Sequence, residues 1–177
     1  MMSEMNERMT IRDIAGFCPE EAIWKMLADV SDFLLKDGKG YVLRSDAIAI
    51  DGSTFMVEAE QSATTEAEMV WALGAVAYEA VMGHVVFGGH GESYQQQHPH
   101  VALPHLPKAF QRLTPIVHQC LCHDEGKRIG LKNLSQQAHK GLETCRQEGR
   151  ETVPTTATST TTEKRQREKW PEEMREV

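Results

Sequence analysis

The chain has 177 residues, 40% of them hydrophobic and 25% charged, and a formal net charge of −7. This composition is typical of a soluble globular protein, and the length allows one domain with a sizeable core plus an extension. The acidic balance argues against non-specific binding to nucleic acid and favours a partner with a basic surface.

The chain begins with a segment, residues 1–9, that we expect to be flexible. It carries charges and no apolar stretch, so it does not resemble a signal peptide. Thr10 and Asp13 have the spacing of a capping box, which predicts a short helix that Gly16 ends.

A longer helix is predicted from Pro19 to about Lys36. Proline suits the first turn of a helix, Glu20 and Glu21 favour its positive end, and Gly38 stops it. Apolar residues recur at helical spacing along one face. They are Ile23, Leu27, Val30 and Leu34.

Three short strands are predicted next, over Tyr41–Leu43, Ala47–Ile50 and Phe55–Val57. Asp51-Gly52 is a strong hairpin signal between the second and the third strand. The segment from Glu58 to Glu68 is acidic and rich in Ser and Thr, which is typical of a linking segment.

The most apolar stretch, Met69–Phe87, predicts the central helix of the core. Its apolar residues occupy all faces at helical spacing, so we expect protein on every side of it. Thr64 or Thr65 is placed to cap its start, and Gly83 to end it. The run is short for a membrane crossing and contains Glu79, so a core helix is favoured over a membrane span.

The chain after Gly83 is rich in Gly, Pro, Gln and His, which predicts a long, mobile surface loop over Phe87–Pro107. A helix is predicted from about Lys108 to His123, and a final core helix from about Lys132 to Glu148. Residues 149–177 are threonine-rich and then highly charged, which predicts a disordered linker and tail.

The cysteines and histidines do not predict a disulfide framework or a convergent metal site. Four cysteines in this chain indicate free thiols in a reducing cytoplasm. Two groups lie close in sequence: His98, His100 and His105, and Cys120, Cys122 and His123. Zinc needs ligands that converge on one tetrahedron, whereas Cys120 and Cys122 on one helix point about 200° apart. We expect no metal and no cofactor, although the loop histidines leave a metal site open.

Carboxylates are denser between residues 46 and 68 than in the rest of the chain. The residues are Asp46, Asp51, Glu58, Glu60, Glu66 and Glu68. One interpretation is an acidic groove that attracts a Lys/Arg-rich partner. The other is a solvated acidic rim that keeps the protein soluble.

Three stretches, in order, resemble segments of the large C-terminal lobe of a protein kinase. LRSDAIAIDGSTFMVEA resembles the family's double hairpin, L-K-P-x-N-I-L-L-D … V-K-L-x-D-F-G. MVWALGAVAYEAVMGHVVFGG resembles D-[IV]-W-S-L-G … E-x-x-x-G-x-x-P-F, and CLCHDEGKRIGLKNL resembles C-L-x-x-D-P-x-x-R. Matches include Leu43, Ile48, Ile50, Asp51, Trp71, Leu73, Gly74, Tyr78, Glu79, Gly83, Phe87, Cys120, Leu121, Asp124 and Arg128.

The resemblance implies the fold of a kinase lobe without the kinase reaction. A kinase needs a catalytic Asp, a metal-binding Asn and Asp, and an N-lobe with a Gly-rich loop and a Lys. Here Gly40-Tyr41-Val42 replaces His-Arg-Asp, Ala47 replaces the Asn, and Ala59 lies about where the metal-binding Asp belongs. The nine residues before Thr10 are too few for an N-lobe, so we expect no enzyme activity.

A kinase C-lobe without these parts resembles the kinase non-catalytic C-lobe (KIND) domain. IRDIAGFCPEEAIWKML resembles that family's opening, S-L-x-x-[IV]-L … L-x-E-E-[EA]-x-W-x-[IL]-L. Members of the family are interaction modules, and those studied grip a basic peptide from an actin-nucleating protein. The resemblance therefore implies a pseudokinase-like scaffold that binds a protein or peptide partner.

Together these observations predict a mainly α-helical domain over residues 10–148. The expected fold is a protein-kinase-like C-terminal lobe with small β-hairpins and no N-lobe. The expected function is non-catalytic binding of a basic peptide or protein in the cytoplasm, without nucleic acid or a membrane span. Two alternatives are a divergent kinase or nucleotide-binding protein, and a regulatory pseudokinase that docks on an active kinase through an apolar patch.

Overall fold

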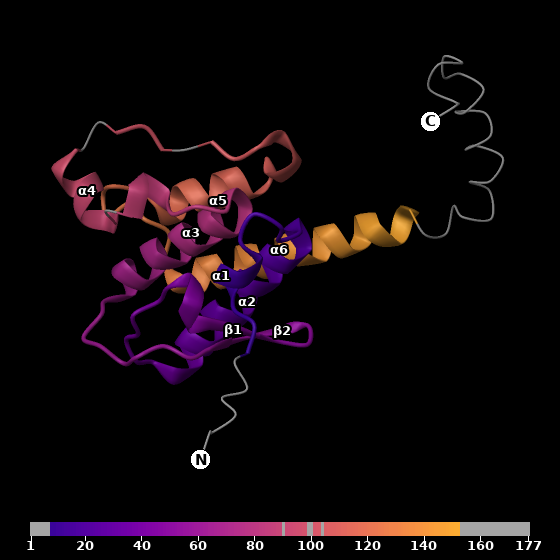
Figure 1. Cartoon of the computed structure of the whole chain (residues 1–177), viewed down its shortest axis with the longest axis horizontal. Coiled ribbons are helices and arrows are strands. Elements are labelled where there is room, and N and C mark those ends of the chain that lie inside the picture. The colour runs from indigo at the N-terminus through magenta and orange to yellow at the C-terminus, as the bar shows by residue number, and fades with distance from the viewer. Residues whose placement is uncertain (1–7, 90, 99–100, 104, 153–177) are drawn as a thin grey trace. The chain divides into compact units, whose positions relative to one another are not determined.

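The computed structural model describes residues 8–89, 91–98, 101–103 and 105–152 (Figure 1). The predicted threonine-rich linker and charged tail lie almost entirely outside these residues, as does most of the predicted flexible N-terminus. The chain divides into two compact units, Met1–Leu142 and Glu143–Val177. The described part is mainly helical, as predicted, and its strands form one two-stranded antiparallel sheet.

The first two helices begin beside the predicted capping residues, but the first ends at Ile14, two residues before the predicted stop at Gly16. In α1 (Ile11–Ile14), the Asp13 carboxylate accepts a hydrogen bond from the Thr10 amide at 2.8 Å, which confirms the capping box. Helix α2 (Glu20–Asp37) ends at Gly38, whose φ of +72° is the left-handed conformation that favours glycine.

The hairpin consists of β1 (Ile48–Asp51) and β2 (Thr54–Val57), which follow a 3₁₀ turn, η1 (Ser45–Ala47). Ile48 pairs with Val57 and Asp51 with Thr54, so the loop has two residues. Gly52 is its first residue and has φ +62°, which a type II′ turn requires at that position.

The first predicted strand, Tyr41–Leu43, is absent from the described sheet. Tyr41 instead forms a single bridge with Gln61, between two hydrogen bonds that link Gly40 to Ser62 and Val42 to Glu60. The pairing is too short to make a ladder, because the chain turns into η1 directly afterwards.

The central helix, α3 (Glu66–Met82), is buried on most of its circumference, as its composition predicts. Thr65 caps its start and Gly83, with φ +81°, follows its end. Helix α3 packs on α5 (Leu113–Cys120) and also contacts α1 and α2 (Figure 1). A Cβ at Gly74 would lie 2.5 Å from Cys120 Cβ, so the absence of a side chain there allows the two helices to approach closely.

The prediction of a long loop over Phe87–Pro107 is wrong in part. Its first half forms a 3₁₀ turn, η2 (Val86–Gly89), and a short helix, α4 (Gly91–Gln97). Helix α4 has no apolar stripe, so periodicity does not predict it. It is anchored instead by Gln95, which is 1% exposed and hydrogen-bonded to both Trp71 and Leu121.

The helix predicted over Lys108–His123 is also shorter than expected. Its beginning is a separate 3₁₀ turn, η3 (Lys108–Phe110), and α5 starts only at Leu113. Pro115 lies in the first turn of α5, where its missing N–H has no helical partner to lose, so it fixes the start just before it.

The last helix, α6 (Leu131–Thr152), confirms the predicted final helix and is longer at both ends. Within the first unit, Leu134, Ala138 and Leu142 are buried as expected. Gly141 lies against the Trp24 indole so closely that a Cβ would come within 2.5 Å of the ring. The described residues include no helix with the length and hydropathy of a bilayer crossing.

Candidate binding site beside the central helix

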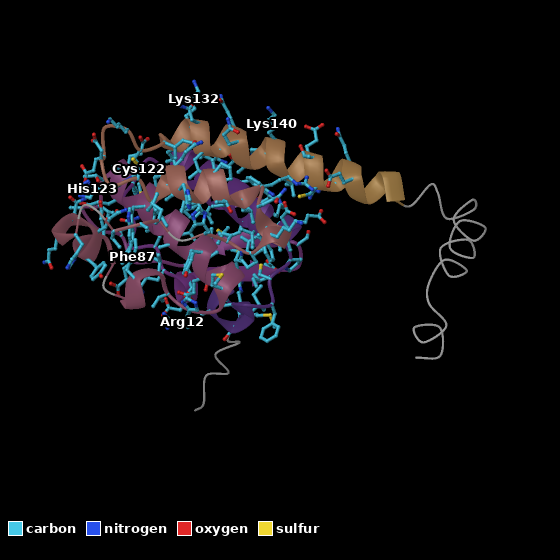
Figure 2. All side chains as sticks on the ribbon, turned by 90° about the horizontal axis from the view of Figure 1, so that it is seen from above. Arg12, Phe87, Cys122, His123, Lys132 and Lys140 are labelled. Carbon is cyan, nitrogen blue, oxygen red and sulfur yellow. The ribbon has the colours of Figure 1, made fainter. Side chains whose placement is uncertain are left out.

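A cavity of about 180 Å³ lies beside α3, and we call it the α3 cavity. Five segments of the first unit line it: α1, the turn into η1, α3, η2 with the residue before it, and the start of α4. The lining residues are Arg12, Leu43, Arg44, Ser45, Trp71, Ala72, Ala75, Val76, Glu79, Val85, Val86 and Gly91. Figure 2 shows Arg12 and Phe87 on two of these segments.

The wall formed by α3 follows from helical spacing. Trp71, Ala72, Ala75, Val76 and Glu79 occur at i, i+1, i+4, i+5 and i+8, so they share one face of the helix. The two alanines are small and leave the space, while the larger residues at either end close it. The wall is therefore apolar except for the carboxylate of Glu79.

The opposite wall depends on strained backbone at η2. Phe87 has φ +54° and is the one residue other than glycine with positive φ in the described part of the chain. Such a conformation is unfavourable for a bulky residue and persists only where packing imposes it. Phe87 stacks between Trp71, at a centroid distance of 6.5 Å, and Tyr94, at 5.6 Å. This stack holds Val86 in the lining, where it is 4% exposed.

Glu79 is the one acidic residue among the described residues that line the α3 cavity. The residue is 8% exposed. Among the described residues, none forms a hydrogen bond or an ion pair with its carboxylate. The carboxylate oxygens are not fully buried, so a ligand in the cavity can reach them, and a cation or hydrogen-bond donor there would supply the partner that they lack.

Two positively charged side chains, those of Arg12 and Arg44, lie at the rim of the cavity. Arg12 Nε donates to Ser45 Oγ at 3.3 Å, and Arg12 Nη1 lies 3.1 Å from Asp46 Oδ2. Arg44 Nε lies 3.3 Å from the other oxygen, Asp46 Oδ1, without hydrogen-bond geometry. The arginine side chains are 56% and 65% exposed. Two guanidiniums therefore share one carboxylate at the mouth of the cavity.

The predicted acidic residues do not gather at this cavity. Asp46 does not line it but contacts two residues that do, Arg12 and Arg44. Glu58 is paired with Arg8 at 3.0 Å, and Glu68 accepts a hydrogen bond from the Thr65 amide in the capping box that begins α3. The remaining three are exposed at separate places: Asp51 in the hairpin, Glu60 in the segment after it, and Glu66 at a second cavity of about 250 Å³ near the end of α2.

Glu79, Arg12, Arg44 and Trp71 were not predicted as site residues. The available signal was Glu79, because it is the single carboxylate inside the apolar stretch of the central helix. Its burial and its lack of a described partner depend on tertiary structure. The two arginines belong to segments far apart from α3 in sequence, so no local pattern indicates them.

The cysteine and histidine clusters show no metal-site geometry. In the described part of the chain, no three His, Cys, Asp or Glu side chains come close enough to hold an ion, and His100 lies outside it. Burial raises the pKa of the Cys120 thiol to about 12 and that of Cys18 to about 11. Both are therefore protonated and unreactive at neutral pH.

The α3 cavity thus combines apolar surface with the carboxylate of Glu79 and the guanidiniums of Arg12 and Arg44, a lining suited to holding a charged side chain. Compared with models of protein families and with curated proteins, the chain matches none.

Proposed function

We propose that this chain is a non-catalytic interaction module that binds a basic peptide or protein, with one Lys or Arg side chain of the partner inserted into the α3 cavity. The observation that carries the proposal is Glu79, a residue 8% exposed that lines this cavity and whose carboxylate has no described partner. A cationic side chain offers both the charge and the hydrogen-bond donors that this carboxylate lacks.

The balance of charges supports a cation inside the cavity in spite of the two arginines at its rim. Those guanidiniums are more than half exposed and both are already paired with Asp46, so water and salt screen their repulsion. Glu79 is far less exposed than the two arginines, at 8% for the residue, and has no described partner that offsets its charge. The inner part of the cavity therefore selects a positive group.

The size of the cavity supports one side chain rather than a complete small molecule. Ligand sites for small molecules and cofactors usually have volumes of about 300–1,000 Å³. The α3 cavity, at about 180 Å³, is smaller. The long apolar stem of a Lys or Arg matches the lining of Trp71, Val76 and Val86, and its charged end would reach Glu79.

The absence of catalysis is part of the same proposal and follows from the resemblance to a kinase lobe. The positions of the catalytic Asp, the metal-binding Asn and the metal-binding Asp correspond to Val42, Ala47 and Ala59. None of these side chains can accept a proton or hold magnesium. A lobe without these residues would belong to a KIND-like or pseudokinase scaffold.

The cation site can be tested without knowing the partner. Butylguanidinium and its neutral isostere butylurea are titrated into the full chain, and binding is followed by NMR at the indole N–H of Trp71 and the amides of Val85 and Val86. Butylguanidinium should bind at least about tenfold more tightly than butylurea. Glu79→Gln should remove this preference, whereas Glu125→Gln, at an exposed carboxylate outside the cavity, should keep it.

Equal binding of the two compounds by the parent chain would contradict the cation site. So would an unchanged preference in Glu79→Gln. A second titration, with nona-arginine against nona-citrulline, extends the test from one side chain to a basic peptide.

A further inference from the structure

Arg12 and Arg44, at the rim of the α3 cavity, have more N–H donors than their described contacts use. Each guanidinium carries five N–H donors, ten for the pair. Arg12 directs one of them to Ser45 and approaches Asp46 through another nitrogen, and Arg44 approaches Asp46 through Nε alone. The local charge of these two arginines and Asp46 is +1, on a chain whose net charge is −7. The rim is therefore a small positive site with free hydrogen-bonding capacity.

The two arginines differ in how firmly they are held. Arg12 belongs to α1, which is anchored by Ile11, 0% exposed, and its guanidinium has two partners, one of them the buried Ser45. Arg44 precedes η1, its side chain is 65% exposed, and it has one partner at 3.3 Å without hydrogen-bond geometry. Arg44 can therefore turn toward a ligand while Arg12 keeps Asp46 in place.

The positive rim and Glu79 are separate charges in one cavity, since neither guanidinium forms an ion pair with that carboxylate. We propose that Arg44, supported by Arg12, binds a carboxylate of the partner at the same time as Glu79 binds the partner's cationic side chain. The ligand of the α3 cavity is then a dipolar peptide motif: a Lys or Arg accompanied by an acidic side chain or a free C-terminal carboxylate.

A carboxylate fits this rim because the guanidinium fork binds it through two parallel hydrogen bonds. The dipolar arrangement also explains how a cation passes two arginines, because the accompanying carboxylate neutralises the rim as the cation enters. This inference rests on the proposed function for the kind of partner, but the two charges of the cavity can be tested separately.

Three small compounds test the negative and the positive charge of the cavity separately. Nα-acetylarginine carries a guanidinium and a carboxylate, Nα-acetylargininamide replaces the carboxylate by a neutral amide, and N-acetylnorvaline has the carboxylate without the guanidinium. Each is titrated into the full chain and into the variants Arg44→Gln, Glu79→Gln and Arg8→Gln, with the Trp71 indole N–H as the NMR signal. Arg8 is a matched control, because it is exposed and paired with Glu58 outside the cavity.

In the parent chain, Nα-acetylarginine should bind about threefold to tenfold more tightly than its amide. Arg44→Gln should reduce this ratio to about one, and Arg8→Gln should leave it unchanged. Glu79→Gln should weaken both arginine compounds while the ratio between them remains. Raising the salt concentration should reduce the ratio more than it weakens the amide, because Arg44 is exposed and Glu79 is buried.

A ratio of one in the parent chain, or an equal loss in Arg44→Gln and Arg8→Gln, would overturn the carboxylate subsite while the cation site remains. Binding of N-acetylnorvaline that depends on Arg44, with no binding of the amide, would contradict the proposed function and keep the subsite. If none of the compounds binds, both proposals are wrong. Two tripeptides, one with arginine next to glutamate and an amidated end and one ending in arginine with a free carboxylate, then identify the source of the carboxylate.

Discussion

The indole N–H of Trp71 donates a hydrogen bond to Gln95 Oε1 at 2.9 Å, and the amide of the same glutamine donates to the carbonyl of Leu121. One buried polar side chain therefore connects α4 to the central helix and to the end of α5. Since Trp71 lines the α3 cavity, this connection also fixes one wall of the candidate site.

Replacing Gln95 by leucine is expected to destabilise the protein by about 2–4 kcal/mol, because the Trp71 N–H and the Leu121 carbonyl both lose their partner in a buried place. Urea unfolding measures the change. Gln96→Leu is the matched control: Gln96 is exposed and its bond to the His123 carbonyl is 3.3 Å long, so the expected cost is below about 1 kcal/mol. Equal costs for the two variants would show that α4 is not held by Gln95.

Gly16 and Gly83 meet backbone to backbone, and this contact attaches α1 to the end of α3. Both have positive φ, the Gly16 amide donates to the Ala80 carbonyl at 2.9 Å, and a Cβ on Gly83 would lie 3.3 Å from Gly16 Cα. Gly83→Ala is therefore expected to cost about 1–2 kcal/mol for the left-handed conformation and more for the close contact.

Gly38→Ala separates the two contributions. Gly38 also has positive φ and follows α2, but a Cβ there would meet nothing within 4 Å. Its cost should be the conformational part alone, about 1–2 kcal/mol, by chemical unfolding. A Gly83→Ala variant no less stable than Gly38→Ala would contradict a role for the Gly16–Gly83 contact.

Helix α4 and the glycines that follow α2 and α3 also show what local sequence signals can and cannot predict. The ends of α2 and α3 were predicted because capping and glycine stops act within a few residues: Thr65 accepts from the Glu68 amide, and Gly38 and Gly83 adopt left-handed backbone. Helix α4 was not predicted because its support is a hydrogen bond between residues 24 positions apart, Trp71 and Gln95.

The candidate site was predicted less well than the helices for the same reason. Asp46 was among the predicted acidic residues, but its ion pair with Arg12 neutralises much of the charge that made it attractive. In the sequence, Glu79 indicates only a charge that argues against a membrane span and a match to the kinase-lobe segment, and neither predicts a site. Its significance comes from the cavity, which segments distant in sequence assemble.

Burial of Cys120 predicts a loss of stability at alkaline pH. The thiol's pKa is raised from an ordinary value of 9.0 to about 12, chiefly by desolvation, so the unfolded chain releases this proton at lower pH than the folded chain. The stabilisation is complete below about pH 9 and declines as the pH rises toward 12, by up to about 1.4 kcal/mol per pH unit.

Cys120→Ala keeps the Cβ that packs on Gly74 and removes the titrating group. Urea unfolding of both proteins at several pH values between 8 and 11 should give a steeper decline for the parent chain than for the variant. Parallel curves would contradict the argument. As a further check, the partly exposed Cys122 should react with a thiol reagent in the folded protein while Cys120 should not.

ATP with Mg²⁺ is expected not to stabilise the protein. A ligand that binds the folded state alone raises stability by about 2.7 kcal/mol at a concentration of 100 times its Kd. On the proposed resemblance to a kinase lobe, Ala47 and Ala59 replace the residues that would hold magnesium, so no such gain should appear in a thermal-shift titration. A rise in melting temperature that saturates with ATP and needs Mg²⁺ would favour the alternative of a nucleotide-binding protein.

The last prediction compares the two sources of negative charge, the buried Glu79 and the exposed carboxylates around the hairpin and the start of α3. The exposed set is tested by changing Glu58, Glu60, Glu66 and Glu68 to glutamine together. These charges are solvated, so they should govern the association rate and its dependence on salt more than the final affinity. Glutamine at position 68 still completes the capping box with Thr65, so α3 should remain intact.

Binding of nona-arginine is measured by stopped flow and at equilibrium, at several salt concentrations. The quadruple variant should associate more slowly at low salt and approach the parent chain at high salt, where the exposed charges are screened. Glu79→Gln should instead dissociate faster at every salt concentration, because its partner is lost inside the cavity. A quadruple variant that loses affinity at all salt concentrations, beside an unchanged Glu79→Gln, would move the binding site from the α3 cavity to the acidic residues first indicated by the sequence.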